Sequence, residues 1–541
     1  MPAKSKWLNW ATALLLALVL MILSAMTLTA GQPVNSDDFA GYLNQAIAIS
    51  EGRLDEQIRL NPWMHPSPAP FLNADDETLT YVWGYPLILS LLHKVFGFDT
   101  WNYGTMLYYK LPVAFCFGLI GGVLFLFYRR RFCWASSLFL SLCFSLNVHF
   151  FSDVNSISPD IPFLLFFLLC LWLIEVALEQ KQILKRILFF AILGVCLWYT
   201  YVLRLNGFSI LMIVAIAHAV HLITQRKGLT LLHLIELLPY ALCFLLLQIS
   251  YLFLPEATSN LSDIGDVDLP TILSHLPYYF HLFCDWLTAL FSRTDTGLFH
   301  ANLLGPLMLI FFVIGVIKEN FWRNIHLYVL IACTVLALFL ISYRQGLRYT
   351  YTILPFLLLY AAHGASHVYR WASAHMDAVL QKTTSHGIRF IGFLAAFVLV
   401  FQTGSYTLDC FQHRGDALPV DDMYSTYAVD TYHFIQQNTP DDCTIAYFKP
   451  RALYLNTGRF SFKPQLPDEY IHNGEVFLPY QSHRTDLMDA DYILICNEVD
   501  DNNPMYPYGE QVRRLTSFLE GKAELQCIYQ NPSYELYELK K

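Results

Sequence analysis

Long apolar stretches recur along most of this chain. A helix that crosses the hydrocarbon layer of a membrane needs about 20 predominantly apolar residues. Eleven such stretches are found, at residues 7–29, 107–128, 132–150, 158–178, 186–203, 207–223, 231–254, 301–317, 325–342, 349–371 and 389–406. The sequence therefore predicts a polytopic α-helical membrane protein with about 11 transmembrane helices.

Charged residues divide the chain into two regions. Residues 1–406 contain 23 Lys or Arg and 22 Asp or Glu, whereas the much shorter region 407–541 contains 11 and 21. The second region has the charge density of an ordinary soluble domain, which is roughly 25%. We therefore predict a transmembrane domain over 1–406 and a separate domain over 407–541. The net charge of −9 argues against nucleic acid as a partner.

The region 407–541 alternates helix and strand patterns. Strands are expected at 444–448, 491–496, 524–530 and 533–539, and helices at 425–438 and near 508–520. This alternation predicts a small α/β domain with a central sheet. Its four cysteines allow three disulfide pairings or none: Cys410, Cys443, Cys496 and Cys527.

Lysine and arginine residues gather on one side of the predicted membrane. With the N-terminus in the cytoplasm, the inner loops hold 15 of them, including Arg129, Arg130 and Arg131, while the outer loops of the membrane region hold eight. The positive-inside rule then places 407–541 outside the cytoplasm. The first span also resembles a cleaved signal peptide, but its apolar run is longer than a typical signal core.

Two outer loops are longer than a helix bundle needs, at residues 30–106 and 255–300. Long loops are where function tends to be found. Within the first, residues 38–50 place apolar side chains on one helical face, which suits a helix lying in the membrane interface. Residues 84–96 form an apolar run too short to span, which indicates a re-entrant or interfacial helix.

Asp37 and Asp38 follow the first span at the outer interface. A carboxylate there is suited to take a proton from an acceptor hydroxyl or amine as a general base. Its neighbour would raise one pKa of the pair. The alternative is that the two acids cap the following helix, because Asp is a preferred N-cap residue.

Two further acids, Asp153 and Asp160, flank the outer turn between the third and fourth spans. Acidic residues near membrane depth are rare without a role, although Asp160 also suits a helix cap. Four basic residues occupy outer ends of spans, against the orientation bias: Lys110, Arg204, Arg344 and Arg348. They either bind a lipid phosphate, which a guanidinium does bidentately, or extend their side chains to the interface.

Metal ligation receives little support from the sequence. His281 and Asp285 are four residues apart, with His275 and His300 in the same outer segment, but no tight cluster has metal-ligand spacing. A divalent cation is left open. The chain contains no Gly-rich phosphate loop, Gly-x-Ser-x-Gly or His-Glu-x-x-His motif, which argues against an ATPase, a lipase and a zinc protease.

Several short motifs together resemble the GT-C membrane glycosyltransferases, which include protein O-mannosyltransferases and the aminoarabinose transferase of lipid A. The similar stretches are Asp38-Phe-Ala-Gly-Tyr42 with Ala46 and Gly52, the run 85–97, Asp160-Ile-Pro, Arg348-Tyr349 with Pro355, and Thr439-Pro-Asp-Asp with residues 450–459. A basic residue that some relatives have before the second interfacial helix is missing here, where residues 80–83 read Thr-Tyr-Val-Trp.

The resemblance implies a bacterial inner-membrane enzyme with a periplasmic C-terminal domain. Members move a sugar, with inversion, from a polyprenyl-phosphate carrier to a lipid, glycan or protein acceptor on the outer side. Carried over, Asp38 is the base and Asp37 its partner, while Asp153 or Asp160 is a second acid near the acceptor or a metal. Arg348 and Arg204 then face the lipid phosphate, with Arg344 and Lys110 as further candidates.

Two other functions fit a polytopic chain of this kind. A glycan polymerase or ligase also acts on lipid-linked sugars outside the cytoplasm. A transporter would carry acids or broken helices near the membrane midplane, where Glu236 is a candidate. A membrane-anchored sensor needs only one or two spans and fits less well.

Overall fold

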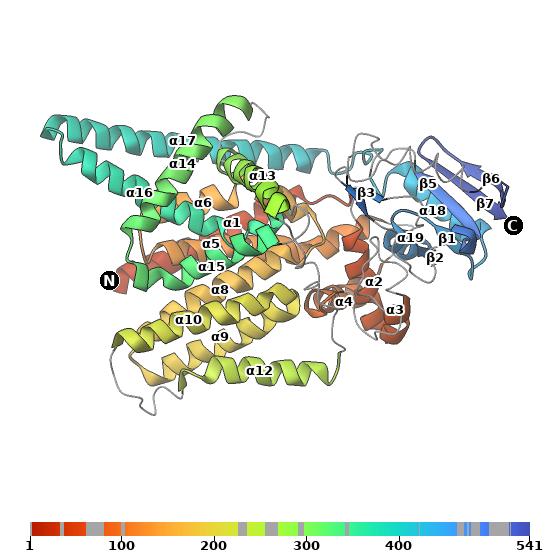
Figure 1. Ribbon diagram of the computed structural model, residues 1–541, viewed down its shortest axis with the longest axis horizontal. Coiled ribbons are helices and arrows are strands. Elements are labelled where there is room, and N and C mark those ends of the chain that lie inside the picture. Colours follow the sequence, from red (N-terminus) through yellow and green to blue (C-terminus); the bar gives the residue numbers. More distant parts are fainter. Residues whose placement is uncertain are drawn as a thin grey trace.

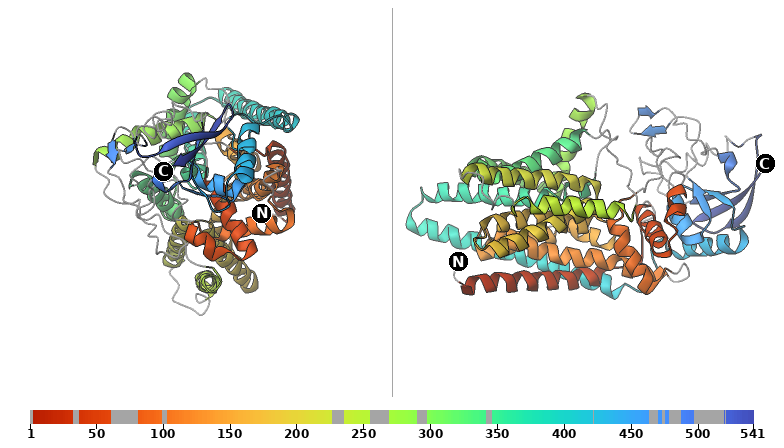
Figure 2. Two further views of the ribbon diagram at one scale, coloured as in Figure 1. Left: turned by 90° about the vertical axis from the view of Figure 1, so that its right-hand side faces the viewer. Right: turned by 90° about the horizontal axis from the view of Figure 1, so that it is seen from below.

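The computed structural model describes residues 3–32, 37–60, 81–98, 103–225, 235–254, 269–289, 297–340, 346–420, 422–462, 470–472, 475–477, 487–496, 519 and 521–541. A bundle of long helices forms one end of an elongated molecule, and a β-sheet with its helices forms the other (Figure 1). Short helices lie between the two (Figure 2). The molecule is therefore divided along its long axis into a helical part and a sheet-containing part.

Each predicted apolar stretch coincides with a helix of the bundle. These helices are α1 (Ala3–Thr27), α5 (Met106–Tyr128), α6 (Trp134–Ser145), α8 (Asp160–Glu179), α9 (Ile183–Leu203), α10 (Phe208–Gln225), α12 (Leu238–Tyr251), α14 (Gly297–Lys318), α15 (Phe321–Leu340), α16 (Leu354–Ser373) and α17 (Ala378–Gln412). Among the described residues, six helices are long and apolar enough to span a membrane, or seven with one bent pair. The multi-pass membrane fold is confirmed, and a count of eleven spans stays a prediction.

The predicted span 132–150 is not one straight helix. α6 ends at Ser145, and the chain turns by 59° into α7 (Val148–Ser152). Asn147 causes the break, because its side-chain oxygen caps α7 by accepting a bond from the His149 N–H, and its amide donates to the Trp286 carbonyl at 2.8 Å. A 3₁₀ turn, η2 (Asp153–Asn155), follows α7.

The predicted span 349–371 also begins later than expected. Arg348 and Tyr349 lie on a 3₁₀ turn, η5 (Leu347–Thr350), and α16 starts at Leu354 with Pro355 in its first turn. A proline suits the first turn of a helix because the amide it lacks would be unpaired there. The Arg-Tyr pair is thus placed just outside the bundle instead of within a helix.

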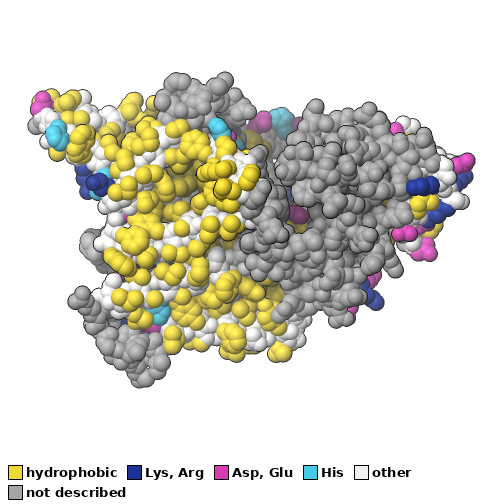
Figure 3. Space-filling view, in the orientation of Figure 1, with side chains coloured by type: hydrophobic (Ala, Val, Ile, Leu, Met, Phe, Trp, Pro, Cys, Tyr) yellow, Lys and Arg dark blue, Asp and Glu magenta, His cyan; other side chains and the backbone are white. Residues whose placement is uncertain are grey.

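Close helix contacts and an apolar exterior are typical of membrane packing. An added Cβ atom at Gly315 of α14 would overlap the Tyr360 carbonyl oxygen, and one at Gly364 of α16 would overlap the Phe311 carbonyl oxygen. Small residues let membrane helices approach closely. Hydrophobic side chains cover the visible face of the bundle (Figure 3), and α17 exposes large ones such as Phe393.

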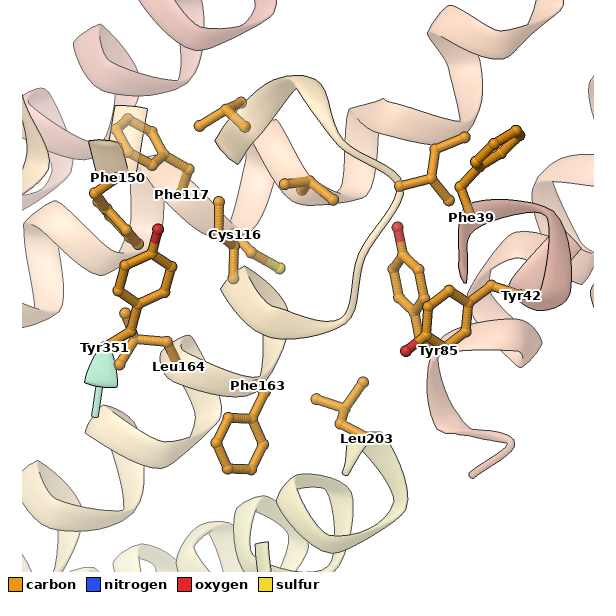
Figure 4. Close-up of a cluster of buried hydrophobic side chains, with 14 of the residues drawn as sticks. Phe39, Tyr42, Tyr85, Cys116, Phe117, Phe150, Phe163, Leu164, Leu203 and Tyr351 are labelled. Carbon is orange, nitrogen blue, oxygen red and sulfur yellow. The ribbon is translucent and has the colours of Figure 1, made fainter. Parts of the chain in front are cut away.

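The first outer loop contains the two helices that were predicted. They are α2 (Asp38–Glu51) and α4 (Gly84–Phe96), with α3 (Leu54–Leu60) between them and the turn η1 (Tyr103–Thr105) after them. Buried side chains join them to the bundle: Phe39, Tyr42 and Tyr85 belong to the same hydrophobic core as Phe117 and others (Figure 4). The second outer loop contains a helix that the sequence analysis did not predict, α13 (Leu269–Thr288).

The C-terminal sheet has five strands in the order β2-β1-β5-β7-β6. They are β1 (Thr444–Ala446), β2 (Phe460–Phe462), β5 (Tyr492–Cys496), β6 (Glu524–Gln530) and β7 (Tyr534–Lys540). β1 pairs in parallel with β2 and β5, whereas β7 pairs antiparallel with β5 and β6. The predicted central sheet and its four predicted strands are confirmed.

Two helices accompany this sheet. α18 (Thr426–Asn438) matches its prediction, and α19 (Pro450–Thr457) was not predicted. A separate hairpin consists of β3 (Tyr470–His472) and β4 (Glu475–Phe477), and a 3₁₀ turn η6 covers Leu487–Asp489. The helix expected near 508–520 lies outside the described residues apart from Leu519. All four cysteines of this region are free thiols.

Candidate active site

Bonds between distant parts of the chain bring the C-terminal region onto the end of α1. Arg414, just beyond α17, donates hydrogen bonds to the carbonyls of Leu28 and Ala25 at 2.9 and 2.7 Å. The Gln32 N–H donates to Asp422 Oδ1 at 3.0 Å, and the Gln32 carbonyl accepts a hydrogen bond from the Met423 N–H. These bonds fix the region that leads into α18 and α19 beside the start of α2.

Asp38, the first residue of α2, is the acid predicted to be the base. Its Oδ1 accepts a 3.0 Å hydrogen bond from the Tyr81 hydroxyl and lies 3.7 Å from Nη1 of Arg451. Its Oδ2 lies 3.6 Å from Nη2 of Arg348. The Asp38 side chain is 45% exposed, whereas that of Arg451 is 5% exposed. The carboxylate is therefore held on its protein side and open to solvent on the other.

The surroundings of Asp38 favour its ionised form. Burial alone would raise the pKa of Asp38, but the guanidinium groups of Arg348 and Arg451, together with the Tyr81 hydrogen bond, outweigh burial and lower it. At neutral pH the carboxylate is thus charged. Burial raises the pKa of the Tyr81 hydroxyl well above its usual value, so this group stays protonated and remains a donor.

A glycine on α2 makes room for this arrangement. A Cβ atom at Gly41 would lie 2.5 Å from Cε2 of Tyr81 and 3.1 Å from Cδ of Arg451. Tyr81 also packs against Tyr42 of α2, with ring centres 4.1 Å apart, and the Arg451 guanidinium lies 5.2 Å from the centre of the Tyr81 ring. Tyr81 is therefore enclosed by aromatic and cationic partners on the face of α2 that carries Asp38.

Asp37 has a different environment from its neighbour. It is buried, and its Oδ1 accepts a 3.0 Å hydrogen bond from the Ala452 N–H of α19. It occupies the N-cap position of α2, yet its side chain makes no capping bond there. Burial raises the pKa of Asp37, although the charges of Arg451 and Lys449 act in the opposite direction. Asp37 therefore joins α2 to α19, and the structure does not make it an accessible base.

A second charged cluster lies next to Asp38. The Arg348 and Arg204 guanidinium carbons lie 5.1 and 5.3 Å from the centre of the Tyr349 ring. Such distances allow cation–π attraction. Arg204 forms an ion pair with Asp160, the first residue of α8. Asp38, Arg348, Tyr349, Arg204 and Asp160 thus form a continuous chain of contacts.

Asp160 and Asp153 each have a protein partner. Asp160 Oδ2 accepts a 2.6 Å hydrogen bond from the Ser158 hydroxyl, in addition to its bond with Arg204. Asp153 lies on η2, and its Oδ2 accepts a hydrogen bond from the Tyr351 hydroxyl. Both acids are therefore engaged in positioning neighbouring side chains.

Lys110 does not join this cluster. It is fully buried, and its ammonium donates to the carbonyls of Thr29 and Gly31 at 2.7 Å and to Asn155 Oδ1 at 2.9 Å. Its three N–H bonds are all used to hold the chain that leaves α1, so none remains for the lipid phosphate it was predicted to bind. Arg344 lies outside the described residues.

Tyr81 was not among the predicted site residues, and Arg451 had no predicted role. Tyr81 comes directly before α4, in the stretch noted for its missing basic residue. Arg451 is the second residue of α19, a helix that Pro450 and Gly458 mark at either end, and Gly458 has the left-handed φ of 70° that favours glycine. Those two signals locate the helix, but not its contact with Asp38.

The described residues do not fit a protein-built metal site. They contain no group of three His, Cys, Asp or Glu side chains placed to hold a metal ion. Asp153 and Asp160 are bonded to Tyr351 and Arg204, and His281 and Asp285 lie one turn apart on α13 with no third ligand grouped with them among the described residues. The side chain of His300 lies outside what the structure describes.

Known structures share this fold. ArnT of Cupriavidus metallidurans, bound to undecaprenyl phosphate, is 12% identical with a TM-score of 0.53, and the match covers 99% of this chain and 98% of ArnT. The apo oligosaccharyltransferase of Archaeoglobus fulgidus is 13% identical with a TM-score of 0.54. The match covers 85% of this chain and 65% of that enzyme. This chain thus spans less than two-thirds of that enzyme.

Related archaeal structures contain ligands. The Archaeoglobus fulgidus oligosaccharyltransferase AglB, in complex with an inhibitory peptide and a dolichol-phosphate, is 12% identical with a TM-score of 0.52, over 86% of this chain and 65% of AglB. The oligosaccharyltransferase of that organism has also been crystallised with Zn and sulfate. No protein-family profile and no curated protein sequence matches this chain. The chain has the fold of the GT-C membrane glycosyltransferases.

Proposed function

We propose that this chain is an integral-membrane glycosyltransferase, which moves a sugar from a polyprenyl-phosphate donor to a lipid, glycan or protein acceptor. The observation that carries this proposal is the Asp38 carboxylate, which is half-exposed and ionised between two guanidinium groups. The undecaprenyl phosphate in ArnT and the dolichol-phosphate in AglB support a lipid-phosphate donor. We place the reaction on the extracytoplasmic face of a bacterial inner membrane.

The proposed reaction is a direct displacement with inversion. Asp38 accepts the proton of the acceptor hydroxyl or amine while the acceptor oxygen or nitrogen bonds to the anomeric carbon of the sugar. The bond from that carbon to the phosphate oxygen breaks, and its electron pair leaves with the polyprenyl phosphate. The donor is already activated, so the reaction needs no nucleotide site.

The guanidinium groups beside Asp38 suit the leaving phosphate. Arg348 is 44% exposed in its side chain and Arg204 is 20% exposed, and both guanidinium groups lie within 5.3 Å of the centre of the Tyr349 ring. Arginine binds phosphate bidentately, and fixed positive charge stabilises a leaving group that gains negative charge. Asp160 and Asp153 act here as positioning residues, through Arg204 and Tyr351.

The transporter alternative depended on Glu236, which the structure places in a closed ion-pair cluster. Its carboxylate lies 2.6 Å from Nε2 of His218 and is paired with Arg186. It is 2% exposed in its side chain. Glu236 therefore joins neighbouring helices, and its environment favours a structural role over transport.

The proposal is tested by mass spectrometry of envelope lipids and glycans from a deletion strain complemented with variants. Asp38→Asn keeps the shape of the side chain but removes the base. We expect wild type to restore a sugar-sized mass that the Asp38→Asn strain lacks, because loss of a general base typically costs about 10²–10⁴-fold in rate.

The matched control is Asp55→Asn, which removes an exposed acid from the nearby helix α3. It should restore the mass fully. Equal membrane levels of both variants, measured by immunoblot, separate loss of chemistry from loss of protein. Full restoration by Asp38→Asn would overturn the proposed base.

A further inference from the structure

A cavity of about 360 Å³ lies at the end of the bundle farthest from the sheet. Its walls come from the turn between α5 and α6, the last turns of α8 and α10, and the start of α15. Arg129, in the turn between α5 and α6, donates a hydrogen bond to Asn9 near the beginning of α1. Sites for small molecules occupy about 300–1,000 Å³, so the cavity has room for a small polar group.

Charges of both signs line this cavity in balance. Nε of Arg130 lies 2.8 Å from Glu175 Oε2, and Nη2 of Arg130 lies 2.6 Å from Glu179 Oε1. Arg131 also pairs with Glu175. Two guanidinium groups therefore face two carboxylates. A bound anion would add a negative charge that no group of the wall neutralises. A ligand with one positive and one negative charge would keep the cavity neutral.

Two polar groups of the cavity wall, on Arg130 and Glu179, have an atom that makes no hydrogen bond. Among the described residues, Nη1 of Arg130 makes no hydrogen bond. Nε2 of His326 is buried and lies 3.6 Å from Glu175 Oε1, so it belongs to this ion-pair cluster and is not open to the cavity. The Glu179 side chain is 64% exposed and bonds through one oxygen only. The cavity thus offers a guanidinium donor on one side and a carboxylate oxygen on the other.

Apolar groups complete the cavity. Ile174 and Leu178 of α8 and Val220 of α10 contribute to its wall. Trp322 also lines it and is 63% exposed, next to the exposed Phe321. Tryptophan is enriched at the level of lipid headgroups, where one end is apolar and the other wet. The cavity is therefore placed where a lipid headgroup meets its acyl chains.

We infer that this cavity binds the headgroup of a zwitterionic phospholipid, with a phosphate and a primary ammonium, from the leaflet opposite the sheet. The phosphate bonds to Nη1 of Arg130, and the ammonium bonds to Glu179. The acyl chains leave along the apolar wall beside Trp322. This site lies at the other end of the bundle from Asp38 and does not depend on the proposed function.

Native mass spectrometry of the full chain, purified in detergent and mixed with equal amounts of phosphatidylethanolamine and phosphatidylglycerol, tests the inference. We expect preferential retention of phosphatidylethanolamine. Arg130→Ala and Glu179→Gln should each reduce that retention about tenfold, the usual order for one charge-assisted bond. Arg370→Ala removes an exposed arginine near the end of α16 and should change nothing.

Three results would overturn the inference. One is equal or greater retention of phosphatidylglycerol. Another is unchanged retention of phosphatidylethanolamine in Glu179→Gln, a variant that should fold normally because the Glu179 side chain is exposed. The third is displacement of the lipid by soluble phosphoethanolamine at equal concentration, which would make a free metabolite the occupant. Displacement only by a large excess would support a lipid source.

Discussion

The guanidinium group of Arg451 is buried where the C-terminal region meets the membrane helices. A buried charge is tolerated only when it is paired and hydrogen-bonded. Arg451 lies 3.7 Å from Asp38 and donates to the Tyr81 hydroxyl at 2.5 Å. Its positive charge also acts on Asp37, where it offsets part of the rise in pKa that burial causes. The Arg451 side chain thus influences both acids, and its own contacts are with protein groups.

We expect Arg451→Gln to move the acidic limb of the activity profile to higher pH. The pKa of Asp38 is lowered in the folded protein, so base activity is present above that pKa and is lost as pH falls through it. Removal of one opposite charge raises this pKa, and the shift is modest because Asp38 is half-exposed. Sugar transfer measured between pH 3 and pH 8, roughly the range around the ordinary Asp value, reports the shift.

Two companion variants separate electrostatics from folding. Arg451→Lys restores the charge and should return the limb toward that of wild type. Arg459→Gln removes another buried arginine of the same region, one that bonds to Thr439 and Asp441. It should lower stability without moving the limb. A limb that stays fixed in Arg451→Gln would show that Arg451 does not tune Asp38.

Pairs of helices set the positions of these residues. α14 and α16 approach so closely at Gly315 and Gly364 that neither position has space for a Cβ atom. α16 follows η5, which carries Arg348, so the contact between the two helices helps to place this arginine. A substitution at Gly315 or Gly364 should therefore disturb the packing of α14 against α16, and it should affect activity only through that packing.

Gly315→Leu should destabilise the bundle. Inserting atoms into a packed interior typically costs about 1–3 kcal/mol, and here the overlap is with backbone. Thermal unfolding of the purified protein in detergent measures the loss. Gly392→Leu provides the control, because Gly392 of α17 has open space around it. Equal melting temperatures in the two variants would contradict tight packing of α14 against α16.

Sequence patterns predicted the elements that depend on local spacing. α2 and α4 appear as apolar runs of the expected lengths, and Asp38 was proposed as the base because it lies a few residues after the first span. The contact of Arg451 with Asp38 has no local signal, since it joins an eight-residue helix to α2 across almost the whole chain. Lys110 was misjudged for a similar reason. Its acceptors are backbone carbonyls, which any sequence supplies, so only the fold shows that they converge.

The long axis of the whole molecule separates two kinds of surface. α1 has 25 residues, and at 1.5 Å per residue it is roughly 37 Å long, enough to cross the hydrocarbon layer. Arg129 bonds near its first turns and Arg414 bonds at its other end. The basic cluster at 129–131 and the C-terminal sheet therefore lie at opposite ends, as the positive-inside rule expects for a sheet outside the cytoplasm.

Two native cysteines test this orientation. Cys133 is exposed beside the basic cluster, and Cys527 is exposed on β6. A membrane-impermeant maleimide should label Cys527 in spheroplasts and label Cys133 only after the membrane is permeabilised. Cys133→Ser and Cys527→Ser identify each signal. Labelling of Cys133 before permeabilisation would mean that the chain is inserted the other way round.

The hydrogen bond between Asp37 and the Ala452 amide joins residues 415 positions apart. Ribosomes add about 5–20 residues per second, so α2 is synthesised roughly 20–80 s before α19. During that interval Asp38 has no Arg451 beside it. A chain that ends before α19 therefore lacks the contact between Arg451 and Asp38. The last quarter of the protein to be translated thus completes the surroundings of Asp38, which lies near the beginning of the chain.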